Sequence, residues 1–128
     1  MVSNYLLFRF GPNTISHVLK ELVKENSSFG SLDIYVSTDG TMYKSHVNMA
    51  ENRSLLILIP LLLGLGKTIN SIYVPKLKKL FSFAECVGIA GGEPKSSFYF
   101  IGCHEENFIY LDPHEINEST FNVMFKYL

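Results

Sequence analysis

Two residues close to the end of the 128-residue chain, Asp112 and His114, have the side-chain types and the spacing of a catalytic acid–base pair. Residues i and i+2 of a strand project from the same face, so this spacing directs a carboxylate and an imidazole into one site. Pro113 between them fixes its own φ and donates no hydrogen bond, which indicates the end or the edge of a strand. An aspartate that orients and charge-stabilises a histidine supplies two of the three members of a nucleophilic triad. The pair therefore predicts acid–base chemistry, and the third member, a nucleophile, has to be found elsewhere.

The composition is that of one globular domain with a sizeable core, since 47% of the residues are hydrophobic and 18% are charged. The formal net charge of −1 and the lack of a basic tract argue against nucleic acid and an anionic membrane as electrostatic partners. The two cysteines, Cys86 and Cys103, are too few for a disulfide scaffold or a zinc site of the usual spacing. We therefore expect no metal, no cofactor and a reducing, cytoplasmic location.

The first part of the chain predicts a helix followed by a hairpin of strands. Leu32–Val36 alternates like a strand, and the pair Asp39-Gly40 is a hairpin-turn signal from which residues 41–47 return. Before them, apolar residues with helical spacing predict a helix over residues 14–25, with Asn13 or Thr14 as its N-cap. These apolar residues form one helical stripe: Ile15, Val18, Leu19, Leu22 and Val23.

The longest apolar run, Ser54–Leu65, contains a proline and is too short to span a bilayer. Its segment Leu55–Ile59 is apolar at nearly every position, which is typical of a central strand with both faces covered. Residues 64–68 imitate a phosphate loop, but Leu61 stands where such a loop needs its first glycine. The run therefore predicts a buried strand and no nucleotide site.

The elements that have to position Asp112 and His114 lie in the second half. Asn70 is expected to cap a helix over residues 71–81, with Lys76, Lys78 and Lys79 facing water and a buried apolar stripe. The stripe consists of Tyr73, Leu77, Leu80 and Phe81. Strands are then expected over residues 87–90, 97–103 and 108–112, and a short helix over residues 117–128. This order predicts an α/β or α+β domain that has a mixed sheet with flanking helices.

Six segments between Phe10 and His114 resemble, in one colinear order, the C-terminal half of the catalytic domain of the autophagins, the autophagy cysteine proteases. Two of them stand out, since one heads the predicted helix and the other contains the acid–base pair. The segments are Gly11-Pro12-Asn13-Thr14, Leu58-Ile59-Pro60-Leu61 with Leu63-Gly64-Leu65, Ile69-Asn70 with Tyr73 and Leu77-Lys78, Val87-Gly88-Ile89-Ala90-Gly91-Gly92 with Pro94, Tyr99-Phe100-Ile101-Gly102, and Tyr110-Leu111-Asp112-Pro113-His114.

The resemblance implies a papain-like fold and a thiol endopeptidase that cleaves after a glycine. The implied substrate is the ubiquitin-like autophagy modifier, which the family matures at its C-terminus and later releases from phosphatidylethanolamine. Contact with a membrane is then expected only indirectly, through the lipidated substrate. By position, Asp112 resembles the triad acid and His114 the general base. The segment that resembles the mobile loop over the active site comprises Gly92, Glu93, Pro94, Lys95 and Ser96.

The sequence departs from the family in three ways. The family's nucleophilic cysteine lies in a Gly-Trp-Gly-Cys motif upstream of the Gly-Pro-Asn helix, whereas this sequence contains no Trp. Leu62 stands where the family usually carries Arg, and the resemblance ends after His114. Residues 1–128 are therefore expected to form one partial peptidase domain that lacks the nucleophile-bearing half.

Neither cysteine of this chain is expected to replace the missing nucleophile. If residues 97–103 and 108–112 pair, Cys103 lies opposite Phe108 and Tyr99 opposite Asp112, which places Cys103 about 15–20 Å from His114. Cys86 begins a strand at the wrong end, and both thiols are expected to be buried and structural. Three interpretations remain open: a partial cysteine protease, an inactive binding module (a pseudoprotease) for the modifier, and a small α/β domain in which Asp112 and His114 merely pair.

Overall fold

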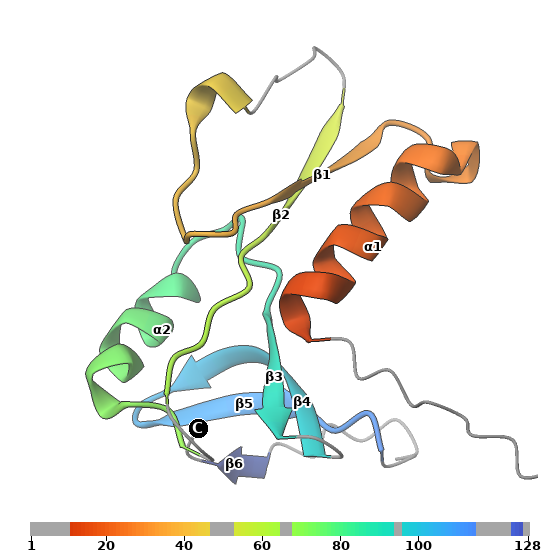
Figure 1. Cartoon of the computed structure of the whole chain (residues 1–128). Coiled ribbons are helices and arrows are strands. Elements are labelled where there is room, and N and C mark those ends of the chain that lie inside the picture. Colours follow the sequence, from red (N-terminus) through yellow and green to blue (C-terminus); the bar gives the residue numbers. More distant parts are fainter. Residues whose placement is uncertain (1–10, 47–52, 65–67, 94–95, 115–123, 127–128) are drawn as a thin grey trace, which may run out of the picture. The chain divides into compact units, whose positions relative to one another are not determined.

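The computed structural model describes residues 11–46, 53–64, 68–93, 96–114 and 124–126 (Figure 1). The chain divides into two compact units, Met1–Leu61 and Leu62–Leu128, and each is described by itself. Among the described residues, no helix has the length and apolar character needed to cross a membrane.

The first unit begins with helix α1, Pro12–Glu25, which confirms the predicted helix. Its N-cap is Gly11, whose carbonyl accepts a hydrogen bond from Ile15 N–H, and Pro12 occupies the first helical turn. The prediction of Asn13 or Thr14 as N-cap is therefore wrong. Proline suits this position because its fixed φ is helical and a first-turn residue needs no N–H donor.

Strand β1, Leu32–Val36, pairs in parallel with β2, Ser54–Leu58. The predicted hairpin across Asp39-Gly40 is therefore wrong, although Gly40 does adopt a positive φ of 73°. The loop after β1 satisfies its polar groups locally, since Thr41 N–H donates to Asp39 Oδ1 and Ser37 Oγ–H donates to the Thr41 carbonyl. The chain then forms a 3₁₀ turn, η2, Lys44–His46, where a returning strand was expected.

The prediction that Leu55–Ile59 is a central strand is also wrong for the part of the chain that the structure describes. There β2 has β1 as its one paired neighbour, and Ile57 and Ile59 are 37% and 49% exposed. An uninterrupted apolar run is typical of a strand with both faces covered, and here that cover is incomplete.

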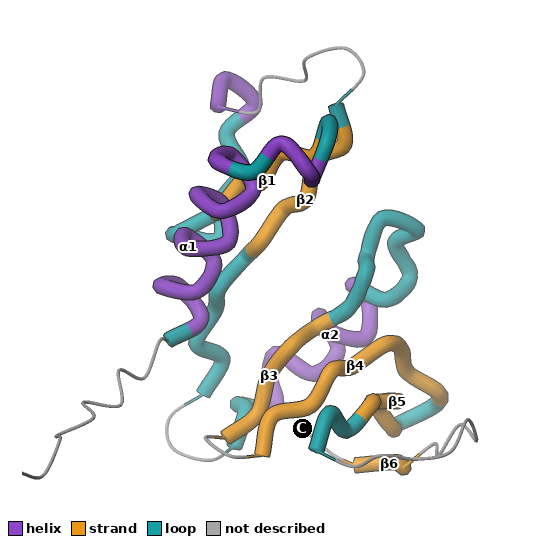
Figure 2. Tube along the Cα trace, turned by 90° about the vertical axis from the view of Figure 1, so that its right-hand side faces the viewer, coloured by secondary structure: helices purple, strands orange, loops and turns teal. Residues whose placement is uncertain are grey.

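The second unit contains a short helical segment and a four-stranded antiparallel sheet. The 3₁₀ turn η3, Ser71–Tyr73, leads into helix α2, Val74–Leu80. The strands follow one another in the sheet in chain order, with α2 against one face (Figure 2). They are β3 (Ile89–Glu93), β4 (Ser96–His104), β5 (Asn107–Leu111) and β6 (Met124–Lys126).

Asn70 caps this helical segment as predicted, because its side-chain oxygen accepts a hydrogen bond from Ile72 N–H. Of the predicted buried stripe, Leu77 is buried, whereas Leu80 is 39% exposed. The helix predicted over residues 117–128 is wrong at residues 124–126, which form β6, and the rest of that segment lies outside the described residues.

The core of the second unit consists of aromatic side chains from β4 and β5 packed against Leu77 of α2. Phe100, Phe108 and Tyr110 are 1–5% exposed, and the Phe100 ring contacts the other two at centroid distances of 6.2 and 5.8 Å. Fully burying a side chain of this size contributes about 1.5–3 kcal/mol, so this cluster holds the strands that lead to Asp112.

The α/β class is thus confirmed. The predicted mixed sheet is wrong for the described residues, because the parallel pairing and the antiparallel pairings lie in two separate sheets, one in each unit. Within the second unit's sheet, β5 ends at Leu111, directly before the predicted acid–base pair.

Candidate active site

The acid–base pair follows directly after β5, and the register of β5 against β4 sets its position. Cys103 pairs with Phe108, as predicted. The register shifts between Phe100 and Gly102, so Tyr99 pairs with Leu111 and the predicted pairing of Tyr99 with Asp112 is wrong. A bulge of this kind places one extra residue on one strand, which re-aims the chain beyond it.

Asp112 and His114 are brought together by a turn. Asp112 Oδ1 accepts a hydrogen bond from His114 N–H at 2.9 Å and lies 2.9 Å from His114 Nδ1. Since β5 ends at Leu111, both residues lie beyond the strand, and the strand alternation used to predict the contact is not its cause. An aspartate that binds the backbone two residues onward forms an Asx-turn, and Pro113 supplies the fixed φ that favours such a turn.

This geometry assigns distinct roles to the two nitrogens of the imidazole ring. An ionised carboxylate only accepts hydrogen bonds, so the neutral His114 ring has to carry its proton on Nδ1. Nε2 then presents a lone pair and is the atom able to take a proton from a nucleophile. The side chain of Asp112 is 19% exposed and that of His114 is 50% exposed, so the acid is more sheltered than the base.

The two cysteines lie away from this pair in the structure. Cys103 occupies the end of β4 next to the turn, and its Sγ–H lies 3.9 Å from the Lys78 carbonyl. Cys86 precedes β3, and its N–H donates to the Phe83 carbonyl. Both thiols are free and half-buried, so the prediction of buried cysteines is wrong. The register of β4 against β5 places Cys103 at the opposite end of that hairpin from Asp112.

The segment predicted to form a mobile loop lies at the tip of the β3–β4 hairpin. Gly92 and Glu93 end β3 and Ser96 begins β4, with Glu93 paired to Ser96. Residues 94–95 lie outside the described residues. The pairing of β3 with β4 therefore extends further into this segment than the predicted strands do. The mobility of the tip stays a prediction.

One contact that anchors the start of this hairpin was not predicted from the sequence. The Tyr99 hydroxyl donates to the Val87 carbonyl, and the Tyr99 ring lies directly over Gly88. Gly88 has a φ of +143°, and a Cβ there would lie 2.6 Å from the ring. The signal available in the sequence was a glycine inside an apolar strand, which often marks a close approach of this kind.

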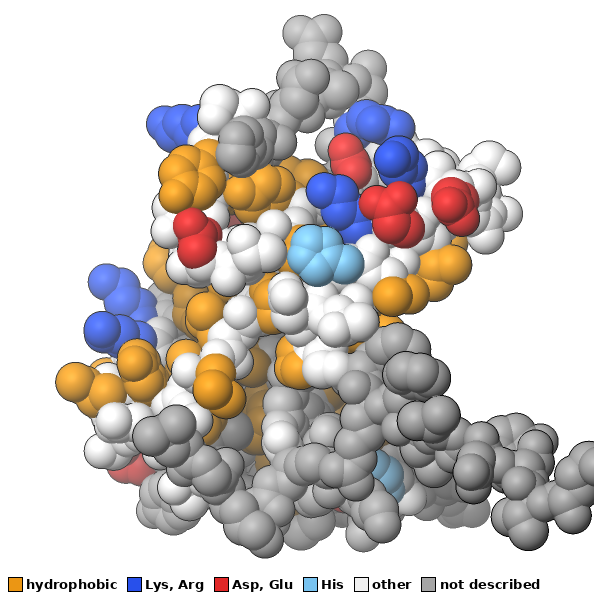
Figure 3. Space-filling model, in the orientation of Figure 1, with side chains coloured by type: hydrophobic (Ala, Val, Ile, Leu, Met, Phe, Trp, Pro, Cys, Tyr) orange, Lys and Arg blue, Asp and Glu red, His pale blue; other side chains and the backbone are white. Residues whose placement is uncertain are grey.

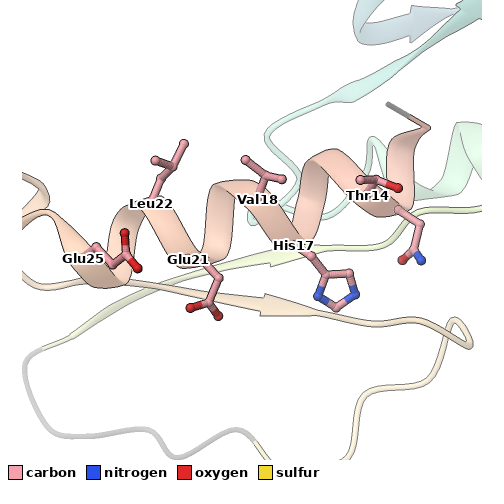
Figure 4. A pocket seen from close by; sticks show the side chains of 7 residues that line it. Thr14, His17, Val18, Glu21, Leu22 and Glu25 are labelled. Atoms are coloured by element: carbon pink, nitrogen blue, oxygen red, sulfur yellow. The ribbon is translucent and has the colours of Figure 1, made fainter. Parts of the chain in front are cut away.

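Open hollows occur elsewhere on the molecule. One of about 490 Å³ lies along α1, and another of about 400 Å³ is lined by residues 62–64, 68–70 and 73. Asp112 and His114 line neither of them. Figure 3 shows charged side chains of both signs gathered at the surface over α1, and Figure 4 shows the side chains that line the hollow along this helix. Among the described residues, no group of three or more His, Cys, Asp or Glu side chains could hold a metal ion.

Comparison with known proteins identifies the family. The model of the peptidase C54 catalytic domain matches residues 8–125. The chain is 35% identical over 118 residues to the cysteine protease ATG4D of Xenopus laevis, and 36% identical over 117 residues to the cysteine protease ATG4C of Homo sapiens. Each alignment covers 82% of this chain and 25% of the relative, so the chain spans about a quarter of their length. A cysteine protease atg4 of Dictyostelium discoideum is 49% identical over 75 residues, which cover 59% of this chain and 10% of that protein.

The resemblance to the autophagins is thereby confirmed, since the matched region contains α1, both sheets and the acid–base turn. By this match, and by the mixed α/β structure that accompanies it, the chain belongs to the peptidase C54 family of papain-like autophagy cysteine proteases.

Proposed function

We propose that this chain contributes the acid and the base of an autophagy cysteine endopeptidase that cleaves a ubiquitin-like modifier after its C-terminal glycine. The proposed activity comprises maturation of the modifier and its later release from phosphatidylethanolamine. The observation that carries the proposal is the 2.9 Å contact between His114 Nδ1 and Asp112 Oδ1 inside the region that matches the peptidase domain.

In the proposed reaction His114 Nε2 takes the proton of a cysteine thiol, and the thiolate attacks the carbonyl carbon of the glycine. The imidazolium then gives that proton to the leaving amine, and a thioester to the enzyme forms. Water hydrolyses the thioester with His114 again acting as base, which returns the thiol and releases the glycine carboxylate. The Asp112 carboxylate stabilises the imidazolium through both steps.

The nucleophile of this reaction would come from polypeptide outside the region described here. General base and thiol have to approach within about 3 Å, and Cys103 lies at the opposite end of the β4–β5 hairpin from His114. The relatives are about four times as long as the matched region, which leaves ample chain to carry a cysteine. The tip of the β3–β4 hairpin is proposed as the mobile loop over the site, and the location as cytoplasmic, with membrane contact through the lipidated substrate alone.

The position of the cysteines also supports a second candidate function. A chain that binds the modifier and has an acid–base pair without a thiol in reach would act as an inactive binding module, a pseudoprotease. Both candidates use the same protein substrate and differ in whether cleavage follows binding.

The experiment measures cleavage of a modifier precursor that extends past the glycine, by chain 1–128 alone and mixed with the part of ATG4D from Xenopus laevis that precedes the matched region. Cleavage by the mixture, absent from the chain alone and lost with His114→Ala, is the expected result. Binding of the precursor without cleavage in either case would favour the pseudoprotease. Cleavage by the chain alone would contradict the assignment of the nucleophile to another polypeptide.

A further inference from the structure

Tyr99 occupies the level of the second unit's sheet at which the acid–base turn begins. It pairs with Ala90 of β3 on one side and with Leu111 of β5 on the other, and Figure 2 shows β4 between these two strands. The pair of Tyr99 with Leu111 is the last of the β4–β5 ladder, because β5 ends at Leu111. Asp112 is therefore the first residue beyond a ladder that ends at Tyr99.

The Tyr99 side chain connects this level of the sheet to the chain before β3. On one face of an antiparallel pair, a diagonal neighbour lies within reach of an aromatic side chain, and Gly88 is such a neighbour of Tyr99. The ring covers Gly88, and the hydroxyl donates to the Val87 carbonyl. Both residues precede β3, whose ladder to β4 begins at Ile89. The side chain thus holds β4 to backbone that the ladder itself does not reach.

The last pair of the β4–β5 ladder needs such support. The end of a ladder opens more easily than its middle, because its terminal pair has hydrogen-bonded neighbours on one side only. The register shift between Phe100 and Gly102 lies next to the pair of Tyr99 with Leu111, and a bulge disrupts a ladder locally. The contact of the Tyr99 side chain with the chain before β3 steadies β4 at this pair from the opposite side.

The acid–base contact depends on where this level lies. Asp112 Oδ1 accepts the His114 N–H and lies 2.9 Å from His114 Nδ1. A hydrogen bond weakens steeply when its angle departs from the preferred range. Since Leu111 directly precedes Asp112, a shift of Leu111 carries the carboxylate with it and changes the orientation of the imidazole ring.

We propose that Tyr99 is a positioning residue for the acid–base pair. By holding β4 to the chain before β3 at the level of Leu111, it keeps the Asp112 carboxylate where it orients the His114 ring. Tyr99 acts through the backbone of β4 and β5 and does not take part in proton transfer. The inference rests on the proposed function for its effect on catalysis, and it adds a residue that sets the geometry of the base.

The test compares Tyr99→Phe with the parent chain in the mixture of chain 1–128 and the ATG4D part. Phenylalanine keeps the ring over Gly88 and removes the hydroxyl that donates to Val87. We expect kcat to fall by about 3- to 10-fold, the factor that corresponds to the loss of one hydrogen bond. KM is expected to change by less than about twofold, because the contact orients the base and does not bind the substrate.

Tyr43→Phe is the matched control. It also removes one hydroxyl, which donates to Asp39 in the first unit, and is expected to leave kcat and KM unchanged. Ring ¹⁵N NMR of the histidine-labelled chain in the same mixture measures the geometry of the base without cleavage. The His114 resonances are expected to show the Nδ1–H tautomer in the parent and in Tyr43→Phe. In Tyr99→Phe they are expected to move toward those of an unfolded peptide.

Gly88→Ala disturbs the same contact from the other strand, because its Cβ would lie 2.6 Å from the Tyr99 ring. It is expected to move the His114 resonances in the same direction as Tyr99→Phe. Resonances that stay unchanged in either variant, at a temperature where circular dichroism shows the variant folded, would overturn the inference and leave Tyr99 a structural residue of the hairpin. A rise in KM at unchanged kcat would also overturn it. A parent mixture that cleaves no precursor would refute the proposed function, and the resonances would still decide the inference.

Discussion

At the scale of single residues, Asp112 holds the His114 ring through the same oxygen that accepts the His114 backbone N–H. The ring orientation and the turn are therefore set by one atom. Replacing the carboxylate by an amide retains an oxygen for the backbone bond and removes the charge that favours protonated His114.

We predict that Asp112→Asn lowers kcat of the mixture of chain 1–128 and the ATG4D part by about 10⁴-fold, the loss expected when a triad acid loses its charge. In the chain alone, the same change is expected to shift the ¹⁵N resonances of His114 away from the Nδ1–H tautomer. Glu106→Gln, a carboxylate change in the β4–β5 turn at the opposite end of the hairpin, serves as the control. Unchanged turnover and an unchanged tautomer would contradict the role assigned to Asp112.

A second residue-scale prediction concerns Asp39. The hydrogen bond from Thr41 N–H lowers the pKa of Asp39 below its ordinary value of 3.8. The hydrogen bond that the Tyr43 hydroxyl donates to Asp39 raises the pKa of Tyr43. Because the folded pKa of Asp39 is depressed, its contribution to stability is present above pH 3.8 and is lost as the pH falls through the folded value.

A carboxyl-carbon NMR titration is expected to give Asp39 a lower midpoint than the same residue in an unfolded peptide. Tyr43→Phe removes one donor and is expected to move the midpoint partly back, whereas Thr41→Ala keeps the backbone donor and should leave it in place. A midpoint at or above that of the peptide would show that the loop bonds do not form in solution.

At the scale of elements, the turn between β4 and β5 contains a strained residue. Glu105 has a φ of +51°, where a side chain is disfavoured by about 1–2 kcal/mol relative to glycine. We predict that Glu105→Gly stabilises the chain by about 0.5–1 kcal/mol, the strain relief being partly offset by the flexibility of glycine in the unfolded state. Glu106→Gly removes the 2.7 Å contact with Lys78 and is expected not to raise the free energy of unfolding. Chemical denaturation of both variants distinguishes the two turn positions.

The contact between Tyr99 and Gly88 makes a separate prediction for the β3–β4 hairpin. Gly88→Ala introduces a methyl group 2.6 Å from the Tyr99 ring at a positive φ, and is expected to destabilise the chain by about 1–3 kcal/mol. In a Tyr99→Ala background the steric part disappears, so the cost of Gly88→Ala should shrink. Equal costs in the two backgrounds, measured by denaturation of all four variants, would show that the ring does not restrict this position.

The sequence pattern predicted the existence of α1, β1, β4 and β5, because the spacing of apolar residues differs between helices and strands. Pairing partners could not be predicted in this way: Asp39-Gly40 is a hairpin-turn signal, and β1 instead pairs in parallel with the distant β2. The acid–base pair was predicted from its residue types, and the cause of its contact was not. The contact depends on a β-bulge in β4 and an Asx-turn after β5. These features arise from packing and local hydrogen bonds, which the two-residue alternation of a strand does not predict.

At the scale of the whole molecule, the exposed apolar surface predicts how the chain behaves alone. In addition to the apolar stripe of α1, large apolar side chains are exposed at Ile59, Leu61 and Leu62, and Leu62 is 86% exposed. Surface of this kind promotes association. We predict that chain 1–128 sediments as polydisperse assemblies and becomes monodisperse when the preceding part of a C54 relative is added. A monodisperse, cooperatively melting monomer of the chain alone would contradict this.

The chain-order arrangement of β3 to β6 has a consequence for how the protein folds. In the β4–β5 hairpin, His104 pairs with Asn107 and each further pair closes a slightly longer loop, whereas the first pair of the parallel ladder joins Leu32 to Ser54. Short loops lose little chain entropy on closing, and contacts close in sequence form fastest. We therefore expect the antiparallel hairpin to form early and the parallel pair late. The turn that orients His114 is built at the end of the early hairpin, so a newly made chain acquires its acid–base geometry before its longer-range contacts.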